Sequence, residues 1–199
     1  MLASLLPVAA VGVAAEVAVH GAGTHEVAGQ RFAVPKEWLF SDRISWLPAP
    51  ESDTFTFHLD PIRVSNEIPP HRVTVAPADR ICRRDGVSQI VRIACNRERT
   101  TAAVAPPYMK IFPDPDYPFA WNYYSVAASS ASNQTARRQV AWCTPISPNP
   151  ARPKGTAICT SIWGFEGLVL SLGFEENELP QLADMQARAN QRLRSWKVR

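Results

Sequence analysis

The sequence lacks the short motifs that mark most enzyme active sites. It has no G-x-S-x-G nucleophile elbow, no S-x-x-K motif and no H-E-x-x-H zinc motif. It also has no EF-hand loop, no P-loop and no dinucleotide fingerprint. The enzyme classes that these signatures define are therefore excluded, and we expect neither enzymatic activity, nor a cofactor, nor a metal site.

A large excess of one charge is also lacking. Lys and Arg number 21 against 18 Asp and Glu, a formal net charge of +3 over 199 residues. This excess is too small to indicate a nucleic-acid partner by itself. None of the four cysteines forms a CxxC pair, so the spacing of a zinc knuckle is absent. A hydrophobic fraction of 46% is that of an ordinary globular protein, and the length fits one domain.

The apolar run at the N-terminus is too short to cross a membrane comfortably, which takes about 20 residues. Leu2–Ala15 carries no charge and has the length of the hydrophobic region of a secretory signal. Val13 and Ala15 are small residues at the positions that a signal peptidase requires, so the mature chain is expected to begin at Glu16. No Lys or Arg precedes the run, which departs from the usual pattern.

This N-terminus predicts a signal peptide over residues 1–15, a loose lead-in over residues 16–30 and a single domain over residues 31–199. The expected location is the periplasm. Two alternatives stay open for the first segment: an inner-membrane anchor over residues 1–19, or a helix buried in the core. Contact with a membrane is expected only through this segment.

The even number of cysteines agrees with export, because disulfides persist in oxidising compartments. Cys143 and Cys159 end two strand-like runs and are expected to pair. Cys82 and Cys95 would then close an arginine-rich turn. The alternative is a cytosolic protein with four free thiols.

Alternating apolar residues predict many short strands. Turn residues separate these runs at hairpin-like spacing, which favours an antiparallel meander of roughly six to eight strands. The runs are QRFAVP, DTFTFHLD, HRVTVAP, VSQIVRIAC, AWNYYSVA, RRQVAWC, TAICTSIW and GLVLSLGF.

The C-terminal stretch changes to a helical period. Its apolar residues recur every three or four positions and form one face: Leu182, Met185, Ala189, Leu193 and Trp196. Pro180 suits the first turn of such a helix. We therefore predict an α+β fold, an antiparallel sheet with a C-terminal helix packed on one face.

Few residues are candidates for metal binding or catalysis. His58 is expected on the solvent side of its strand and His71 in a loop, and a metal site that they would form with Asp60 is disfavoured. Asp114 and Asp116 lie two apart, but their flanking prolines favour a rigid loop over a pair of catalytic carboxylates.

Two surfaces are candidates for recognition. The stronger one is a proline-stiffened segment before a strand, with Tyr108, Phe112, Asp114, Asp116 and Tyr117. The alternative is a loop that folds back on its own sheet, and alternation places Phe119, Trp121 and Tyr123 in the core. The second surface is basic and carries Arg80, Arg83, Arg84 and Arg92. The alternative for these residues is a solvated hairpin that binds no partner.

Two stretches, VAGQRFAVPKEWLF and LPQLADMQARANQRLRSWK, flank the run of strands. With this layout the chain resembles small exported bacterial envelope proteins of the PsbP/DcrB-like class, including immunity proteins of type VI secretion toxins. The resemblance implies binding without catalysis and carries no site residues. We expect a protein that neutralises a toxin or enzyme partner. The alternatives are an envelope structural or assembly factor, and a hydrolase without a recognisable motif.

Overall fold

The structure is a computed structural model of the whole chain. It describes residues 22–40, 53–61, 71–83, 89–95, 106–115, 117–127, 136–146 and 157–198. The predicted signal peptide over residues 1–15 lies outside the described residues, and so does the alternative anchor over residues 1–19.

Strands dominate the described residues, and short helices separate some of them. In chain order the elements are β1 (Ala22–Val27), β2 (Gln30–Pro35), η1 (Lys36–Trp38), β3 (Phe55–His58), β4 (Arg72–Pro77), α1 (Ala78–Cys82), α2 (Gln89–Cys95), β5 (Tyr108–Ile111), β6 (Trp121–Ala127), β7 (Ala136–Pro145), β8 (Ala157–Phe165), β9 (Leu168–Glu175), η3 (Glu176–Gln181) and α3 (Leu182–Trp196).

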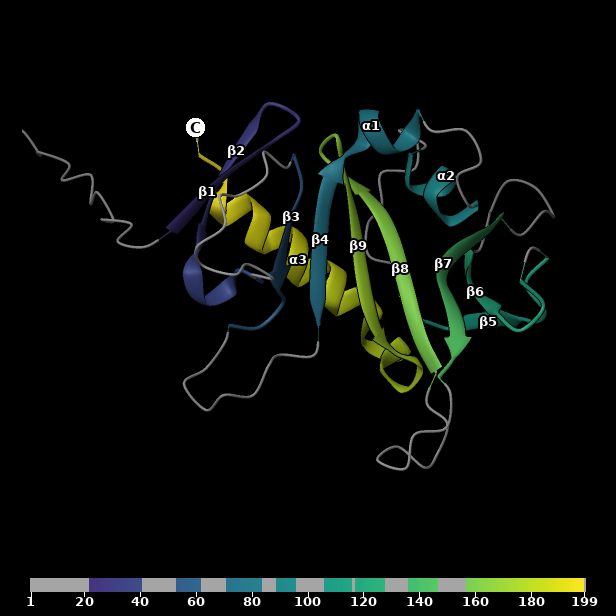
Figure 1. Cartoon of the computed structure of the whole chain (residues 1–199). Helices are drawn as coiled ribbons and strands as arrows, with labels where there is room; N and C mark the ends of the chain where they lie inside the picture. The colour runs from purple at the N-terminus through teal and green to yellow at the C-terminus, as the bar shows by residue number, and fades with distance from the viewer. Residues whose placement is uncertain are drawn as a thin grey trace, which may run out of the picture.

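One large antiparallel sheet organises the fold (Figure 1). Within the described residues it has seven strands in the order β3-β4-β9-β8-β7-β6-β5. Strands β5 to β9 form a meander, and the β3–β4 hairpin joins it alongside β9. After β4 the chain therefore passes through α1 and α2 before it starts the meander at the opposite edge. The predicted α+β class, with its antiparallel sheet and C-terminal helix, is confirmed.

Helices pack on both faces of the sheet. Successive side chains of a strand point to opposite faces, and Trp163 and Gly164 of β8 show what each face meets. Trp163 Nε1 donates to Asn190 Oδ1 of α3 at 3.0 Å. A Cβ placed on Gly164 would lie 2.6 Å from the carbonyl oxygen of Ala94 in α2. Helix α3 therefore covers one face, behind β3, β4 and β9 in Figure 1, and α2 covers one end of the other.

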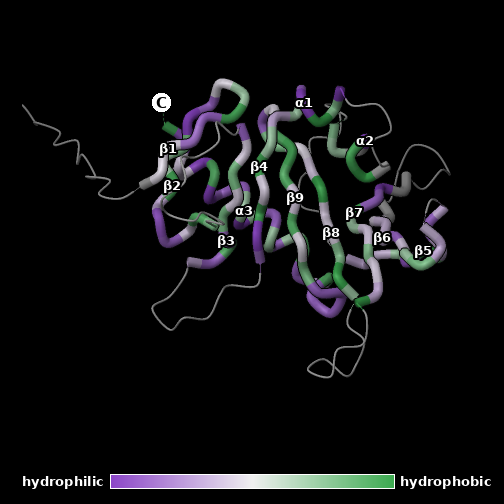
Figure 2. Tube along the Cα trace, viewed as in Figure 1, coloured by the Kyte–Doolittle hydropathy of each residue, from purple (hydrophilic) through white to green (hydrophobic). Residues whose placement is uncertain are grey.

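The core lies between the sheet and α3. Every residue of the predicted helical stripe, from Leu182 to Trp196, is buried. Facing it are the alternate residues of the central strands, among them Trp163, Leu170 and Val75. Figure 2 shows hydrophobic stretches along β8 and β9 at the centre of the sheet. The apolar strand residues and the apolar helix residues that the sequence patterns indicated therefore pack together in one core.

One predicted strand is a helix. The segment VSQIVRIAC is rich in β-branched residues, which predicts a strand, yet Gln89–Cys95 forms α2. Its buried residues Ile90 and Ala94 are four apart, which is the spacing of one helical face. Intrinsic strand preference is weak beside such packing. The predicted arginine-rich hairpin is consequently wrong, because the cysteines at its ends join two helices.

Smaller corrections concern segments near both ends. Within the lead-in expected over residues 16–30, β1 begins at Ala22 and forms a hairpin with β2. Its turn residues Ala28 and Gly29 have φ of 52° and 71°, as a two-residue hairpin turn requires. Pro180 lies in the 3-10 segment η3, just before α3 begins.

His58 is buried, so its predicted position on the solvent side is wrong. The outer edge of β3 is covered by the residues that follow η1, because Leu39 bridges to Phe57 and the Phe40 ring lies 5.4 Å from that of His58. His71 is also buried, and its Nε2 lies 2.9 Å from Glu178 Oε1. Both histidines therefore belong to the packed structure.

Both predicted disulfides are present. Cys143 and Cys159 are directly opposite on β7 and β8, with Cα atoms 4.0 Å apart, and both are fully buried. Cys82–Cys95 joins α1 to α2, with Cα atoms 5.7 Å apart. One disulfide therefore fixes the register of two central strands, and the other holds the helical cover together.

The close approach of α2 to the sheet gives a stability prediction. Gly164→Ala is expected to destabilise the protein by about 1–3 kcal/mol, because the new methyl group must displace the Ala94 backbone. Gly173→Ala is the matched control, since a Cβ there meets nothing within 4 Å. Urea denaturation of the two variants measures the difference, and equal midpoints would contradict the packing of α2 on β8.

Candidate functional site

The best candidate site is the aromatic loop, which we define as residues 112–120 between β5 and β6. Three large side chains stand out from it: Phe112 is 61% exposed, Tyr117 is 50% exposed and Phe119 is 57% exposed. Pro113, Pro115 and Pro118 are exposed between them. Clustered exposed aromatic side chains are typical of protein recognition surfaces.

The loop is held from beneath by the buried carboxylate of Asp114. Asp114 Oδ2 accepts from Asn122 Nδ2 at 2.6 Å, and Oδ1 accepts from the Tyr117 backbone N–H at 3.0 Å. The Asp114 N–H donates to Ala120 O at 2.8 Å, and the Ala120 N–H donates to Tyr117 O at 2.9 Å. These bonds fix the turn that presents the aromatic rings.

A second layer of polar side chains supports Asp114. Gln139 Nε2 of β7 donates to Asn122 Oδ1 at 2.5 Å, so a buried chain of hydrogen bonds runs from the sheet into the loop. Buried polar networks of this kind rigidify the groups that they connect. The structure thus makes Asp114 a support of the loop and not part of its outer surface.

The other predicted site residues are placed as follows. Phe112 and Tyr117 lie in the loop, and Asp116 lies outside the described residues. Tyr108 is half-buried in β5, so the predicted loop position is wrong for this residue. Burial raises the pKa of its phenol above the ordinary value. It supports the edge strand from which the loop starts.

Phe119 is a member of the site that sequence analysis missed. Alternation with Trp121 and Tyr123 predicts a core position, but β6 begins only at Trp121, and Phe119 lies in the preceding turn. The signal was present in Pro118, since a proline cannot donate to a strand ladder and therefore favours a strand that starts after it. The Phe119 ring packs edge-on to Tyr117 at 6.1 Å.

Glu176 ties the two strands that carry the loop to the start of the helical segment. Its Oε1 accepts from Lys110 Nζ at 2.9 Å, from Trp121 Nε1 at 2.9 Å and from the Tyr123 hydroxyl at 2.5 Å. Lys110 Nζ also lies 4.0 Å from the centre of the Trp121 ring. These contacts hold the base of the loop on the side that faces η3. We call Glu176, Lys110, Trp121 and Tyr123 together the clamp.

The clamp shifts the pKa of two of its members. Burial disfavours the Glu176 carboxylate, but the hydrogen bonds from Tyr123, Lys110 and Trp121 and the Lys110 charge outweigh it, so the pKa of Glu176 is lowered from 4.5. Burial, followed by the hydrogen bond to Glu176 and its charge, raises the pKa of Tyr123 well above its ordinary value. The stable form is a carboxylate that accepts from a neutral phenol.

A carboxyl group with a lowered folded pKa stabilises the protein above its unfolded pKa and stops doing so as pH falls through the folded value. Glu176→Gln is therefore expected to cost about 1.5 kcal/mol near neutral pH, the scale of a hydrogen bond to a charged group. The difference from the wild type should shrink once pH falls below 4.5. Denaturation at several pH values tests this, with Glu37→Gln on exposed η1 as control. A difference independent of pH would contradict the clamp.

Two arginines of the predicted basic surface form ion pairs within the fold. Arg80 forms an ion pair with Asp53, and Arg83 Nη2 lies 2.6 Å from Asp79 Oδ2. Arg92 is exposed on α2, and Arg84 lies outside the described residues. This surface therefore offers a partner less free charge than the sequence indicated.

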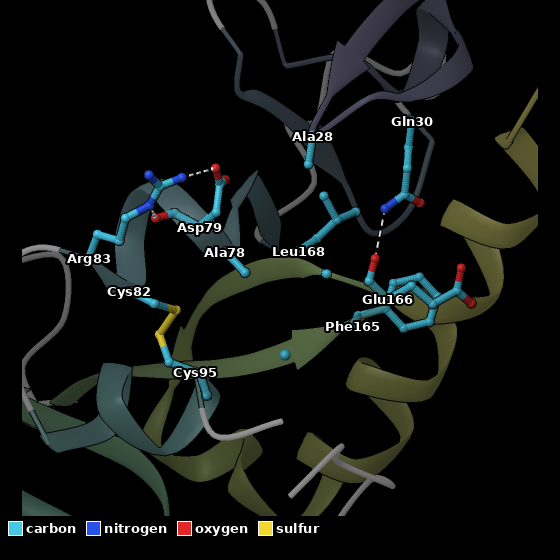
Figure 3. A pocket seen from close by; sticks show the side chains of 13 residues that line it. Ala28, Gln30, Ala78, Asp79, Cys82, Arg83, Cys95, Phe165, Glu166 and Leu168 are labelled. Atoms are coloured by element: carbon cyan, nitrogen blue, oxygen red, sulfur yellow. Dashed lines mark hydrogen bonds and ion pairs between the residues drawn. A yellow bond between two sulfur atoms is a disulfide. The ribbon is translucent and has the colours of Figure 1, made fainter. Parts of the chain in front are cut away.

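A half-open cleft of about 950 Å³ lies beside this surface. Figure 3 shows it between the turn at Ala28, helix α1 and the β8–β9 turn, with the Cys82–Cys95 disulfide along one wall. Glu166, at the cleft, has a lowered pKa because it accepts hydrogen bonds from Lys197 and Arg194, which together outweigh the effect of burial. The contacts with Lys197 and Arg194 within the fold therefore account for the lowered pKa of Glu166.

The described part of the chain offers neither a metal site nor a membrane-spanning helix. It contains no group of three or more His, Cys, Asp or Glu residues placed to hold a metal ion. None of its helices is long and apolar enough to span a membrane.

Comparison with known proteins supports the fold. No protein-family model and no curated protein matches the sequence. The structure is similar to that of Smlt3025, an immunity protein of the Stenotrophomonas maltophilia type IV secretion system. The TM-score is 0.50 at 10% sequence identity, and the match covers 90% of this chain and 94% of the other. The predicted resemblance in layout to immunity proteins is confirmed for the fold. The similar protein belongs to a type IV secretion system, whereas the prediction named type VI secretion toxins.

Proposed function

We propose that this chain is an exported binding protein without catalytic activity that neutralises a toxin or enzyme, and that the aromatic loop makes the central contact. The observation that carries the proposal is the set of three exposed rings on a loop fixed by buried hydrogen bonds. A preorganised loop loses little conformational entropy on binding, and aromatic residues dominate the energetics of interfaces.

The chemistry of the loop favours a concave partner. Phe112, Tyr117 and Phe119 offer apolar area, while the carboxylate of Asp114 is turned inward. Asp116 contributes a charge to the same loop by sequence. The partner that fits is a protein with an apolar cleft and a basic group near the rim of that cleft. The active site of a toxin can be such a cleft.

Two disulfides support the proposed compartment, because such bonds form and persist outside the reducing cytosol. The proposed location is the periplasm, reached through the N-terminal signal segment. The structure is similar to that of an immunity protein. This similarity is one of fold alone, and it agrees with the proposed class of function.

The test is capture of the partner from the native host with the tagged full-length gene product, followed by mass spectrometry. The captured protein should kill a heterologous host when it is exported alone, and should not kill it when this chain is co-exported. Capture of a non-toxic envelope component would favour the alternative role as a structural or assembly factor. Turnover of a substrate by this chain would contradict the proposal.

A further inference from the structure

Resting on the proposed function, we infer that the partner held by the aromatic loop also covers an open face of the central strands. This open face consists of Arg72, Thr74, Trp142, Thr160, Ser171 and Gly173. The occupant is one folded protein, with an apolar cavity for the loop and an acidic group above Arg72.

The strand register places these residues together, on the side of the sheet away from α3. Trp142 of β7 is opposite Thr160 of β8, which is opposite Gly173 of β9, which is opposite Arg72 of β4. Ser171 of β9 is opposite Thr74 of the antiparallel strand β4, two residues along each strand from the Gly173–Arg72 pair. The residues between them in sequence, such as Ser161 and Leu172, face α3.

Three of the six residues of the open face are exposed, and the other three are half-buried. Arg72, Thr74 and Gly173 are exposed, and a Cβ on Gly173 would meet nothing within 4 Å. Helix α2 covers a different part of this side, near Gly164. Hydroxyl and glycine positions let a partner backbone approach closely and hydrogen-bond to the surface.

Interface size argues that the loop is not sufficient. Each aromatic side chain can bury about 150–250 Å² in total, so three rings that are 50–61% exposed supply about 250–420 Å². A stable specific interface takes about 800 Å² from each partner. The remaining area has to adjoin the loop.

The structure fixes the direction in which that area extends. On the η3 side, the clamp of Glu176 and Lys110 closes the base of the loop. On the other side, the Tyr117 ring packs edge-on to Trp142, the first residue of the open face, at 5.7 Å. The exposed surface is therefore continuous from the loop onto the open face.

Arg72 supplies a positive charge at the end of the open face that is farthest from Trp142 in the strand order. The Arg72 guanidinium lies 3.9 Å from the centre of the Phe40 ring, and it forms no ion pair with any other described residue. A guanidinium presented on an aromatic ring is well placed to take a carboxylate. An acidic group of the partner satisfies this position.

Photo-crosslinking in the native host tests the inference and identifies the partner in the same experiment. A benzoylphenylalanine replaces Tyr117, Thr74 or, as a control on the exposed side of α3, Gln191 in the full chain. We expect Tyr117 and Thr74 to give an adduct with the same protein by mass spectrometry, and Gln191 to give none. Gly173→Arg and Arg72→Glu should each reduce the Tyr117 adduct at least tenfold, whereas Gly173→Ala should not.

The outcomes separate this inference from the proposed function. A Tyr117 adduct without one at Thr74, or one that survives both Gly173→Arg and Arg72→Glu, overturns the inference and leaves the loop as the contact. An equal adduct at Gln191 also overturns it. No adduct at either test position overturns the proposed function together with the inference. Thermal melts establish that Gly173→Arg and Arg72→Glu fold, so that loss of the adduct reports on binding.

Discussion

Tyr117→Ala combined with Phe119→Ala is expected to weaken partner binding by at least about 2 kcal/mol, roughly 30-fold, which is the scale of interface hot spots. Both rings are at least half exposed and contact each other, so they present one apolar surface. Stability should change little, because neither side chain lies in the core. Calorimetric titration with the captured partner, beside a thermal melt, measures both effects.

The matched control is Val198→Ala, which removes an exposed apolar side chain far from the loop in sequence. Unchanged affinity in the loop variant would move the contact elsewhere, and the surface at Arg80 and Arg83 would be tested next. A large fall in melting temperature would instead show that the two rings stabilise the fold, in agreement with the alternative of a loop packed on its own sheet.

Trp163→Ala is expected to have the largest effect on stability, a loss of about 3–5 kcal/mol in the free energy of unfolding. The side chain is 0% exposed between β8 and α3, and its Nε1 donates to Asn190 Oδ1. Removal leaves a cavity and an unpaired amide oxygen. Trp163→Phe should cost less, because it keeps most of the packing and loses the hydrogen bond.

Urea denaturation of both variants separates packing from hydrogen bonding. Trp142→Phe serves as the control on the opposite face, where the side chain is only half-buried and the cost should stay within about 1.5 kcal/mol. If Trp163→Ala costs no more than this control, α3 does not rest on the sheet through Trp163.

Most of the fold was predictable because its signals are local. Alternation along TAICTSIW and GLVLSLGF, and the helical stripe from Leu182 to Trp196, each follow from one buried face. The segment Gln89–Cys95 was not predictable in the same way. Its composition suits a strand, and only contact with the sheet and the disulfide to Cys82 makes it a helix.

The candidate site was predictable in position but not in detail. Prolines and aromatic residues marked the loop correctly, since these residue types are evident in sequence. The inward turn of Asp114 depends on Asn122 and Gln139, which come from two strands of the sheet. Exposure of Phe119 depends on where β6 begins. Pro118 marks that start locally, whereas the inward turn of Asp114 arises from tertiary contacts that no local pattern encodes.

The order of strands also governs when the large sheet can be completed. The β3–β4 hairpin finds its place in the sheet only beside β9, which is synthesised after every other described strand, and β2 is bridged to Lys197 near the C-terminus. Contacts so distant in sequence slow folding. An emerging chain thus holds the edge of β4 unpaired until β9 has been made. An unpaired strand edge is prone to aggregation, so a chaperone that covers this edge during synthesis should raise the yield of folded protein.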